Sequence, residues 1–180
     1  GYVLDDGRIV GGNRRFTALR DIHQVTGRTV YFEAVVLPFS YDNITERAKI
    51  KKLELAIQMG VEERQNYDPV DLAVDIYQTT SGDNPIMTQA DYAADSHMRP
   101  TEVKKYYDGA VYMKKFLEFI GAPENNFNII KESKVWSLFY EMGKSLSKNF
   151  GDDPESQVRK NETMNSYFGV ILYQIHVGVS

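Results

Sequence analysis

The chain has 180 residues, of which 42% are hydrophobic and 26% charged, and its net charge is −4 at pH 7. This composition is that of an ordinary globular protein with one or two domains and a substantial core. The acidic total charge excludes a general attraction to nucleic acid, so DNA binding would need a local basic face. The chain contains no cysteine, which excludes disulfides and thiol catalysis and leads us to expect a cytoplasmic location.

No stretch of the sequence predicts a membrane span or a secretory signal. The most apolar run, residues 167–175, has about half the length needed to cross a bilayer. We therefore expect no membrane partner. The chain begins with glycine and enters almost directly into a predicted strand, so we also expect a trimmed chain.

Residues 8–18 predict a strand, a glycine turn and the start of a helix in direct succession. Residues 8–10 are typical of a short strand, and Gly11 and Gly12 give the backbone a freedom that residues with a Cβ lack. Asn13 is expected to act as the N-cap of the helix that follows. One face of that helix carries residues at three- and four-residue spacing, namely Phe16, Leu19, Ile22 and His23.

Arg14 and Arg15 add two permanent charges to the first turn of this helix. The same turn has free backbone N–H groups and lies at the positive end of the helix dipole. Together these groups favour a phosphate ligand. The alternative is an ordinary turn whose arginines are solvated or paired with nearby acids, namely Asp5, Asp6 or Asp21. The stretch is neither a P-loop nor a dinucleotide-binding glycine motif.

Residues 12–18, Gly-Asn-Arg-Arg-Phe-Thr-Ala, resemble the Gly-Glu-Arg-Arg-Trp-x-Ala box of ParB-type partition proteins, which cradles the triphosphate of CTP in that family. Asn13 stands in the place of the family's glutamate. The related sulfiredoxin branch has Gly-Gly-Cys-His-Arg here, and its chemistry depends on a cysteine that this chain lacks. The resemblance implies CTP as a ligand, with Mg²⁺ as a candidate companion, at Gly11, Gly12, Asn13, Arg14, Arg15 and Ala18.

A second match to the same family lies in residues 61–73. Family members have Glu-Asn-x-Gln-Arg-x-x-Leu-x-Pro-x-Glu-x-Ala in this region, and Arg64, Pro69 and Ala73 fall at the matching intervals. The resemblance implies that Arg64 is a further contact of the nucleotide phosphates. Without the family, a loop with a surface arginine followed by a helix cap is an equally good interpretation.

The family's Glu-Asn pair, which is thought to hold magnesium and the triphosphate, differs in this chain. Direct alignment places Gly60 and Val61 at that point, and Glu62 and Glu63 replace the pair only if the loop differs. We therefore expect weak or absent CTP hydrolysis even where the nucleotide binds. No catalytic residue is assigned.

The rest of the N-terminal region predicts alternating strands and helices. Residues 29–37 are rich in β-branched and aromatic residues, which predicts a buried strand, and residues 43–59 predict an amphipathic helix. Asp68 is expected to cap a further helix that Pro69 opens. The turn cluster at residues 81–85 is expected to be a subdomain boundary.

Residues 87–103 have the spacing of a helix-turn-helix. Ala93 is the small residue of the first helix, and Val103 lies ten residues later, the interval at which the second helix packs against that alanine. His97 falls in the turn, where glycine is commoner. A second helix that begins near Arg99 is expected to bury Val103 and to expose its cations.

Thr88 is expected to cap the first helix with Asp91, and Pro100 to open the second. In helix-turn-helix proteins the N-terminal residues of the second helix face base edges, while flanking cations meet phosphates. The alternative is a plain helical hairpin with a solvated basic face. The predicted DNA contacts are Thr88, Gln89, Arg99, Thr101, Glu102, Lys104 and Lys105, of which Arg99, Thr101, Lys104 and Lys105 are expected to be exposed.

The C-terminal third predicts only helices. The second helix is expected to end at residues 121–123, and further helices are expected over 133–148 and from Asp153 onward. Their aromatic stripes are typical of core contacts. No metal site is predicted, because the three histidines are isolated in sequence: His23, His97 and His176.

These features predict an α+β fold: a small ParB/sulfiredoxin-like mixed sheet with helices, N-terminally incomplete relative to the family, followed by an all-α helix-turn-helix subdomain. The expected domains are residues 1–80, 81–123 and 124–180. The resemblance implies a CTP-responsive protein of partition or transcriptional regulation, with double-stranded DNA, a second copy in a homodimer and a partition ATPase as partners. The alternatives are a nuclease or ATP-dependent phosphotransferase on the same fold, and a helical adaptor without ligands.

Overall fold

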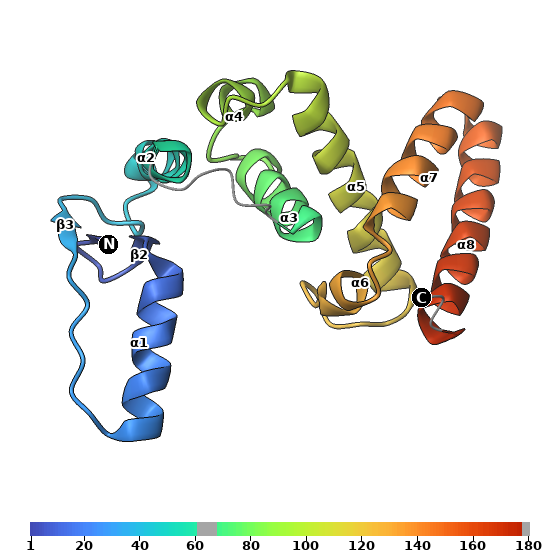
Figure 1. The fold of residues 1–180 in the computed structure, drawn as a ribbon. Coiled ribbons are helices and arrows are strands. Elements are labelled where there is room, and N and C mark those ends of the chain that lie inside the picture. Colours follow the sequence, from blue (N-terminus) through green and yellow to red (C-terminus); the bar gives the residue numbers. More distant parts are fainter. Residues whose placement is uncertain (61–67, 178–180) are drawn as a thin grey trace. The chain divides into compact units, whose positions relative to one another are not determined.

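The computed structural model of this chain describes residues 1–60 and 68–177. The chain divides into two compact units, Gly1–Gln65 with Ala94–His97 and Asn66–Ala93 with Met98–Ser180. Figure 1 shows a small sheet with helices in the N-terminal region and helices alone after it. The α+β class is thereby confirmed, while the division into functional domains at residues 80 and 123 stays a prediction.

The N-terminal sheet has three short strands, β1 (Tyr2–Leu4), β2 (Ile9–Gly11) and β3 (Val35–Leu37). Their order is β2-β1-β3, so β3 is an edge of the sheet. The central strand pairs antiparallel with β2 and parallel with β3, which confirms the predicted mixed sheet.

A tight turn joins β1 to β2. The N–H of Leu4 donates to the carbonyl of Arg8 at 2.8 Å, and Gly7 takes a left-handed φ of 84°. The carboxylate of Asp6 accepts from the backbone N–H of Arg8 at 3.0 Å and from that of Tyr41 at 2.7 Å. Both hydrogen bonds lower the pKa of Asp6, and the one from Arg8 has the larger effect. The turn is therefore tied to the loop that follows β3.

The predicted strand over residues 29–37 is largely wrong. Only Val35–Leu37 forms a strand, because β1 offers three residues and the parallel ladder pairs each of them once. The strand is also not buried, since Val35 is 57% exposed and Val36 is 63% exposed. Residues 29–34 form no regular element.

Two longer helices complete this unit, α1 (Asn13–Thr26) and α2 (Arg47–Gly60), with a short 3-10 turn, η1 (Ile44–Glu46), before α2. The helix predicted over 43–59 is thus confirmed, except that its first turn is the 3-10 turn η1. The small core joins Leu4, Val10 and Ile50, from β1, β2 and α2. The helix predicted after Gly12 is present as α1, and it contributes no buried side chain among the described residues.

From residue 69 to residue 177 every regular element is a helix. Asp68 caps the first of them as predicted, its carboxylate accepting from the N–H of Val70 at 2.9 Å. The helices are α3 (Pro69–Thr80), α4 (Gln89–Asp95), α5 (Pro100–Phe119), α6 (Asn128–Glu132), α7 (Trp136–Asn149) and α8 (Pro154–Val177). The predicted helices are all present, and α6 is an addition to them.

The large core of the chain lies among α3, α5, α7 and α8. Figure 1 shows α5, α7 and α8 side by side. The ring of Phe116, from α5, makes edge contacts with Phe139 of α7 at 5.3 Å and with Phe168 of α8 at 5.5 Å between centroids. All three rings are fully buried. The aromatic stripes thus form a core, as the sequence predicts.

Two glycines let α5 and α7 approach closely. A Cβ on Gly109 of α5 would lie 2.4 Å from the ring of Trp136, and a Cβ on Gly143 of α7 would lie 2.6 Å from that of Tyr112. The ring of Trp136 also stacks on Tyr106 at 5.3 Å between centroids. Each helix therefore places an aromatic ring over a glycine of the other, which fixes their packing.

Helix α5 stops where the sequence predicts. The N–H of Gly121 donates to the carbonyl of Glu118 at 3.1 Å, and that of Ala122 donates to Leu117 at 2.9 Å. Gly121 takes a left-handed φ of 65°. This pair of bonds is a Schellman motif, which satisfies carbonyls at the helix end.

Candidate functional site

The turn from β2 into α1 has the geometry of a helix N-terminus held by glycine. Gly12 takes a left-handed φ of 88° and is the N-cap of α1, and the first helical hydrogen bond runs from the N–H of Phe16 to its carbonyl at 3.0 Å. Asn13 was expected to be the N-cap, and that prediction is wrong, because the helix already includes Asn13. The left-handed backbone before it suits glycine, which has no Cβ to clash.

Arg14, Arg15 and Ala18 are all exposed on the first turns of α1. Neither arginine forms an ion pair or hydrogen bond with any of the described residues. Of the acids that are alternatives for pairing, Asp6 binds elsewhere as described above and Asp21 pairs with Arg20 at 3.5 Å, while Asp5 pairs with neither arginine among the described residues. Two guanidinium groups without a partner in the described part of the chain thus lie beside the N–H groups of a helix start.

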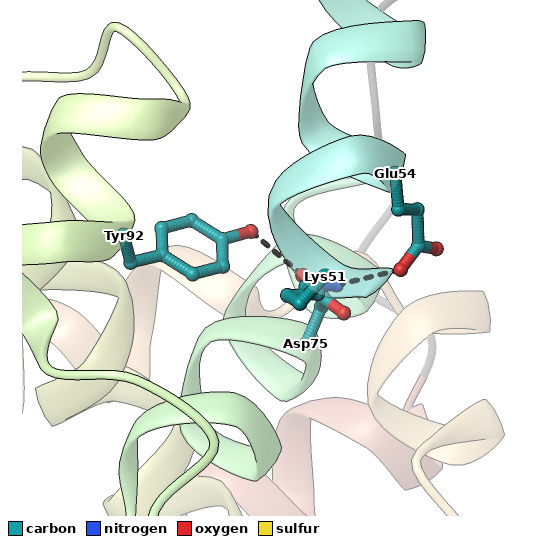
Figure 2. A network of polar contacts seen from close by, with 4 residues as sticks. All are labelled: Lys51, Glu54, Asp75 and Tyr92. Carbon is teal, nitrogen blue, oxygen red and sulfur yellow. Dashed lines mark hydrogen bonds and ion pairs between the residues drawn. The ribbon is translucent and has the colours of Figure 1, made fainter. Parts of the chain in front are cut away.

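Two polar pairs lie on helices farther along the chain, one on α2 and one between α3 and α4 (Figure 2). Within the first unit, the ammonium of Lys51, whose side chain is 8% exposed, pairs with Glu54 at 3.3 Å. Within the second unit, the hydroxyl of Tyr92 donates to the carboxylate of Asp75 at 2.6 Å and so joins α4 to α3. Both pairs were missed at the sequence level, because no motif marks them.

The helix-turn-helix prediction is confirmed in its elements, since α4 is followed after a short turn by α5. Thr88 caps α4 as predicted: its hydroxyl oxygen accepts from the N–H of Asp91 at 3.1 Å and donates to the carboxylate of Asp91 at 2.7 Å. Pro100 is the first residue of α5. The carboxylate of Glu102 accepts from the N–H of Arg99 at 3.3 Å, which closes the N-terminus of α5.

His97 occupies the turn in a left-handed conformation, with φ of 51°. Its N–H donates to the carbonyl of Ala94 at 3.4 Å, and the N–H of Met98 donates to that of Ala93 at 3.1 Å. These bonds are the Schellman pattern that usually places glycine at the position of His97. Ala93 and Val103 are both buried, as the spacing predicts.

The predicted DNA-contacting cations at the N-cap and in the first turns of α5 already have partners. Arg99 pairs with Glu102 at 3.4 Å, and Lys104 pairs with Asp108 at 2.8 Å. Lys105 was expected to be exposed and is half-buried instead, because its ammonium lies 4.3 Å from the ring centroid of Tyr140 of α7. Arg99, Thr101 and Lys104 are exposed as predicted, and Gln89 is half-buried.

Several predicted positions lie outside the described residues, namely Arg64, Glu62 and Glu63. Whether Arg64 reaches the turn at Gly12 therefore stays a prediction. Across residues 1–60 and 68–177, no group of three His, Asp or Glu side chains forms a metal-binding cluster. Over the same part of the chain, none of the helices combines the length and apolar character that crossing a bilayer requires.

No protein-family model, no curated protein and no solved structure matches this chain. The resemblance to ParB-type proteins therefore depends on the two motifs in the sequence, and the function that it implies stays a prediction.

Proposed function

We propose that this chain is a ParB-like, nucleotide-responsive DNA-binding protein that acts in partition or in transcriptional regulation. The observation that carries the proposal is the turn between α4 and α5. A left-handed residue at His97 stands between the buried Ala93 and Val103, and α5 presents Arg99, Thr101 and Lys104 to solvent at its start. In DNA-binding helix-turn-helices, the residues at the start of the second helix contact base edges in the major groove.

In this proposal the start of α5 reads the DNA. Arg99 and Thr101 lie in or beside the first turn and are suited to base edges, while Lys104 lies farther along and is suited to phosphate. The ion pairs of Arg99 with Glu102 and of Lys104 with Asp108 do not prevent DNA binding. Exposed ion pairs stabilise a protein by only about 0–1 kcal/mol, and a phosphate offers a stronger charge. Thr88 and Glu102, whose side chains cap the helices, position the contact surface.

The nucleotide part of the proposal concerns Gly12 and the first turn of α1. Arg14 and Arg15, which have no partner among residues 1–60 and 68–177, lie at a helix start whose N–H groups suit an anion. CTP is the ligand that the resemblance implies, with Arg64 as a further contact and Mg²⁺ as a companion. If nucleotide and DNA favour the same arrangement of the chain, each must raise the affinity of the other equally.

DNA binding is tested by fluorescence anisotropy with a library-selected duplex, titrated across salt concentrations. The log-log salt slope is about −0.9 for each neutralised phosphate, so Lys104→Ala should make the slope shallower by about one unit. Lys144→Ala, on the exposed surface of α7, is the matched control and should leave the slope unchanged. If Arg99→Ala and Lys104→Ala together leave affinity and slope as they are in a folded protein, the helix pair is structural.

Nucleotide binding is tested by calorimetry with CTP, ATP and GTP. Arg14→Ala or Arg15→Ala should each weaken triphosphate binding by about 1.5–3 kcal/mol, because each removes a charge-assisted contact. Lys49→Ala, an exposed cation on α2, is the control of equal charge. Unchanged triphosphate affinity in both arginine variants would remove the nucleotide part of the proposal.

Phosphate release from CTP should be weak or absent, since the family's Glu-Asn pair is replaced. Turnover well above that of the Arg14→Ala protein would instead indicate a hydrolytic enzyme. A homodimer, a partition ATPase as partner and a cytoplasmic location belong to the same proposal and depend on the resemblance alone.

A further inference from the structure

Helix α8 has two apolar faces, and one of them is exposed. Phe168 and Ile171 are buried in the core that α8 shares with α5 and α7 (Figure 1). Because the helix has 3.6 residues per turn, other large apolar side chains fall on its far side. These exposed side chains are Tyr167, Val170, Tyr173 and Val177, and Tyr173 is 66% exposed. A helix that is apolar on both sides has a second surface to cover.

Five residues of the exposed face form a seam along the last turns of α8. Their spacing alternates between three and four residues, as in helices that pack against each other along their length. This outer seam consists of Thr163, Ser166, Val170, Tyr173 and Val177. No Lys, Arg, Asp or Glu occurs in the sequence from Thr163 to Val177. The outer seam is therefore uncharged along its whole length.

The two aliphatic hydroxyl groups of the outer seam have acceptors within the helix. The hydroxyl of Thr163 donates to the carbonyl of Arg159 at 2.8 Å, and that of Ser166 donates to the carbonyl of Glu162 at 3.1 Å. Burial of a hydroxyl is costly when it lacks a hydrogen bond, and these two keep theirs. The hydroxyl of Tyr173, at the tip of a long side chain, can reach water at the edge of a contact. The outer seam can therefore be covered without leaving a donor unsatisfied.

The charge and the shape of the outer seam indicate what covers it. Nucleic acids and anionic membranes attract helices through Lys and Arg, which this seam lacks. Its side chains are small at one end, with Thr163 and Ser166, and larger at the other, with Val170 and Tyr173. An antiparallel copy of the same helix places the small end of one seam against the large end of the other. The outer seam is thus complementary to itself, as a two-fold interface requires.

We infer that the chain pairs with a second copy of itself through the outer seam of α8, with the two helices antiparallel. In this pair Tyr173 of one copy packs at Thr163 of the other, and Val170 packs at Ser166. Each contact occurs twice because of the two-fold symmetry. The inference rests on the proposed function only in expecting a second copy, and its surface is argued from α8 alone.

The end of the outer seam also suits this register. Val177 of one copy comes to Arg159 of the other, whose guanidinium pairs with Glu155 of its own helix. The aliphatic stem of an arginine can cover an apolar side chain while its charged head stays in water. The charges that precede the seam therefore lie at the edge of the contact and do not oppose the pairing.

Sedimentation equilibrium of the whole chain tests the pairing. The chain should show a reversible monomer–dimer equilibrium from roughly 5 μM to 500 μM, because a short helix pair buries less than the about 1,200 Å² at which stable interfaces begin. Val170→Glu should weaken the dimer at least about tenfold, since each pair would then bury two carboxylates. Val158→Glu is the matched control, on the same helix and 58% exposed but off the seam, and should leave the equilibrium unchanged.

Single cysteines test the orientation, because the chain has none of its own. A mixture of the Thr163→Cys and Tyr173→Cys proteins should form a mixed disulfide dimer under mild oxidation. Neither protein alone should cross-link, because in the antiparallel pair equal positions lie ten residues, or roughly 15 Å, apart along the axis. Rapid cross-linking of the Thr163→Cys protein with itself would show parallel helices and overturn the inference.

A wild-type chain that stays monomeric over the whole concentration range would overturn the inference. Equal dimer affinities of Val170→Glu and Val158→Glu, with α8 helical in both by circular dichroism, would place the contact elsewhere and overturn it as well. Binding to neutral lipid vesicles that Val170→Glu abolishes, in place of dimerisation, would assign the seam to a membrane. None of these results changes the proposed DNA or nucleotide binding, which the anisotropy and calorimetry experiments measure separately.

Discussion

Helices α1 and α7 both have 14 residues, yet α7 buries Phe139, Met142, Gly143 and Leu146, whereas α1 buries none of its side chains among the described residues. Both sequences place apolar residues at helical spacing. The difference comes from what surrounds the two helices. Helix α7 packs on α5 and α8, while the aromatic contact of α1 is the edge contact of Phe16 with Phe32. The pattern of a helix therefore indicates which face is apolar and not whether that face is covered.

This contrast separates stability from function in the chain. The interlocked rings and glycines of α5 and α7 hold the second unit together, while the groups proposed to bind phosphate lie on a helix that contributes little to a core. Substitutions on α1 should therefore change binding with little effect on folding. Three predictions test this contrast, from the largest expected effect to the smallest.

The first compares two phenylalanines. Phe116→Ala should lower the free energy of unfolding by about 3–5 kcal/mol, because it opens a cavity against Phe139 and Phe168. Phe16→Ala should lower it by less than about 1.5 kcal/mol, because Phe16 is 37% exposed and has one aromatic contact. Urea unfolding followed by the fluorescence of Trp136, the only tryptophan, measures the second unit.

Phe16 lies in the first unit and Trp136 in the second. If the two units unfold separately, the fluorescence of Trp136 does not report the effect of Phe16→Ala, so far-UV circular dichroism is recorded in parallel. Equal losses in the two variants would contradict the contrast and show that α1 is part of a larger core than the described contacts account for.

The second compares two glycines in helix interiors. Gly143→Ala should destabilise the chain by about 1–3 kcal/mol, because the new methyl group would overlap the ring of Tyr112. Gly169→Ala in α8 should instead stabilise it by up to about 1 kcal/mol, because nothing lies within 4 Å of a Cβ there and alanine favours the helix. Thermal unfolding measures both. A stabilising Gly143→Ala would mean that Tyr112 moves aside at little cost.

The third concerns His97 in the turn before α5. His97→Gly should stabilise the chain by about 1 kcal/mol, because glycine adopts the left-handed conformation without steric cost. Ala94→Gly, at an exposed position inside α4, is the control and should destabilise by about 1 kcal/mol. Thermal unfolding, monitored by circular dichroism, gives the sign of the stability change in each variant. A loss of stability in His97→Gly would show that the imidazole has a role of its own.

The sequence predicts local structure well wherever a few neighbouring residues decide it. Asp68 and Pro69 begin α3, Thr88 begins α4, and Gly121 ends α5, each through hydrogen bonds that span at most a few residues. The same holds for the left-handed turn at His97, which the spacing of the helix-turn-helix places correctly.

Long-range pairing was predicted less well. The strand expected over residues 29–37 shortens to three residues, because its length is set by β1 and not by its own composition. The contacts of Phe32 were also missed, since Phe32 meets Gly12 and Phe16 only after the chain has turned back. No spacing rule links these residues. Lys105 is a similar case, because its cover comes from Tyr140, 35 residues later.

Strand β3 has a consequence for handling the protein at high concentration. It is an edge of the sheet, and its valines are largely exposed, so its backbone is a template to which a strand of another molecule can add. Pro38, which follows Leu37 directly, has no N–H to donate and stops any such ladder from growing in that direction. Proline here acts as a gatekeeper against aggregation, and its replacement by a β-branched residue would supply the N–H that a strand of another molecule could pair with.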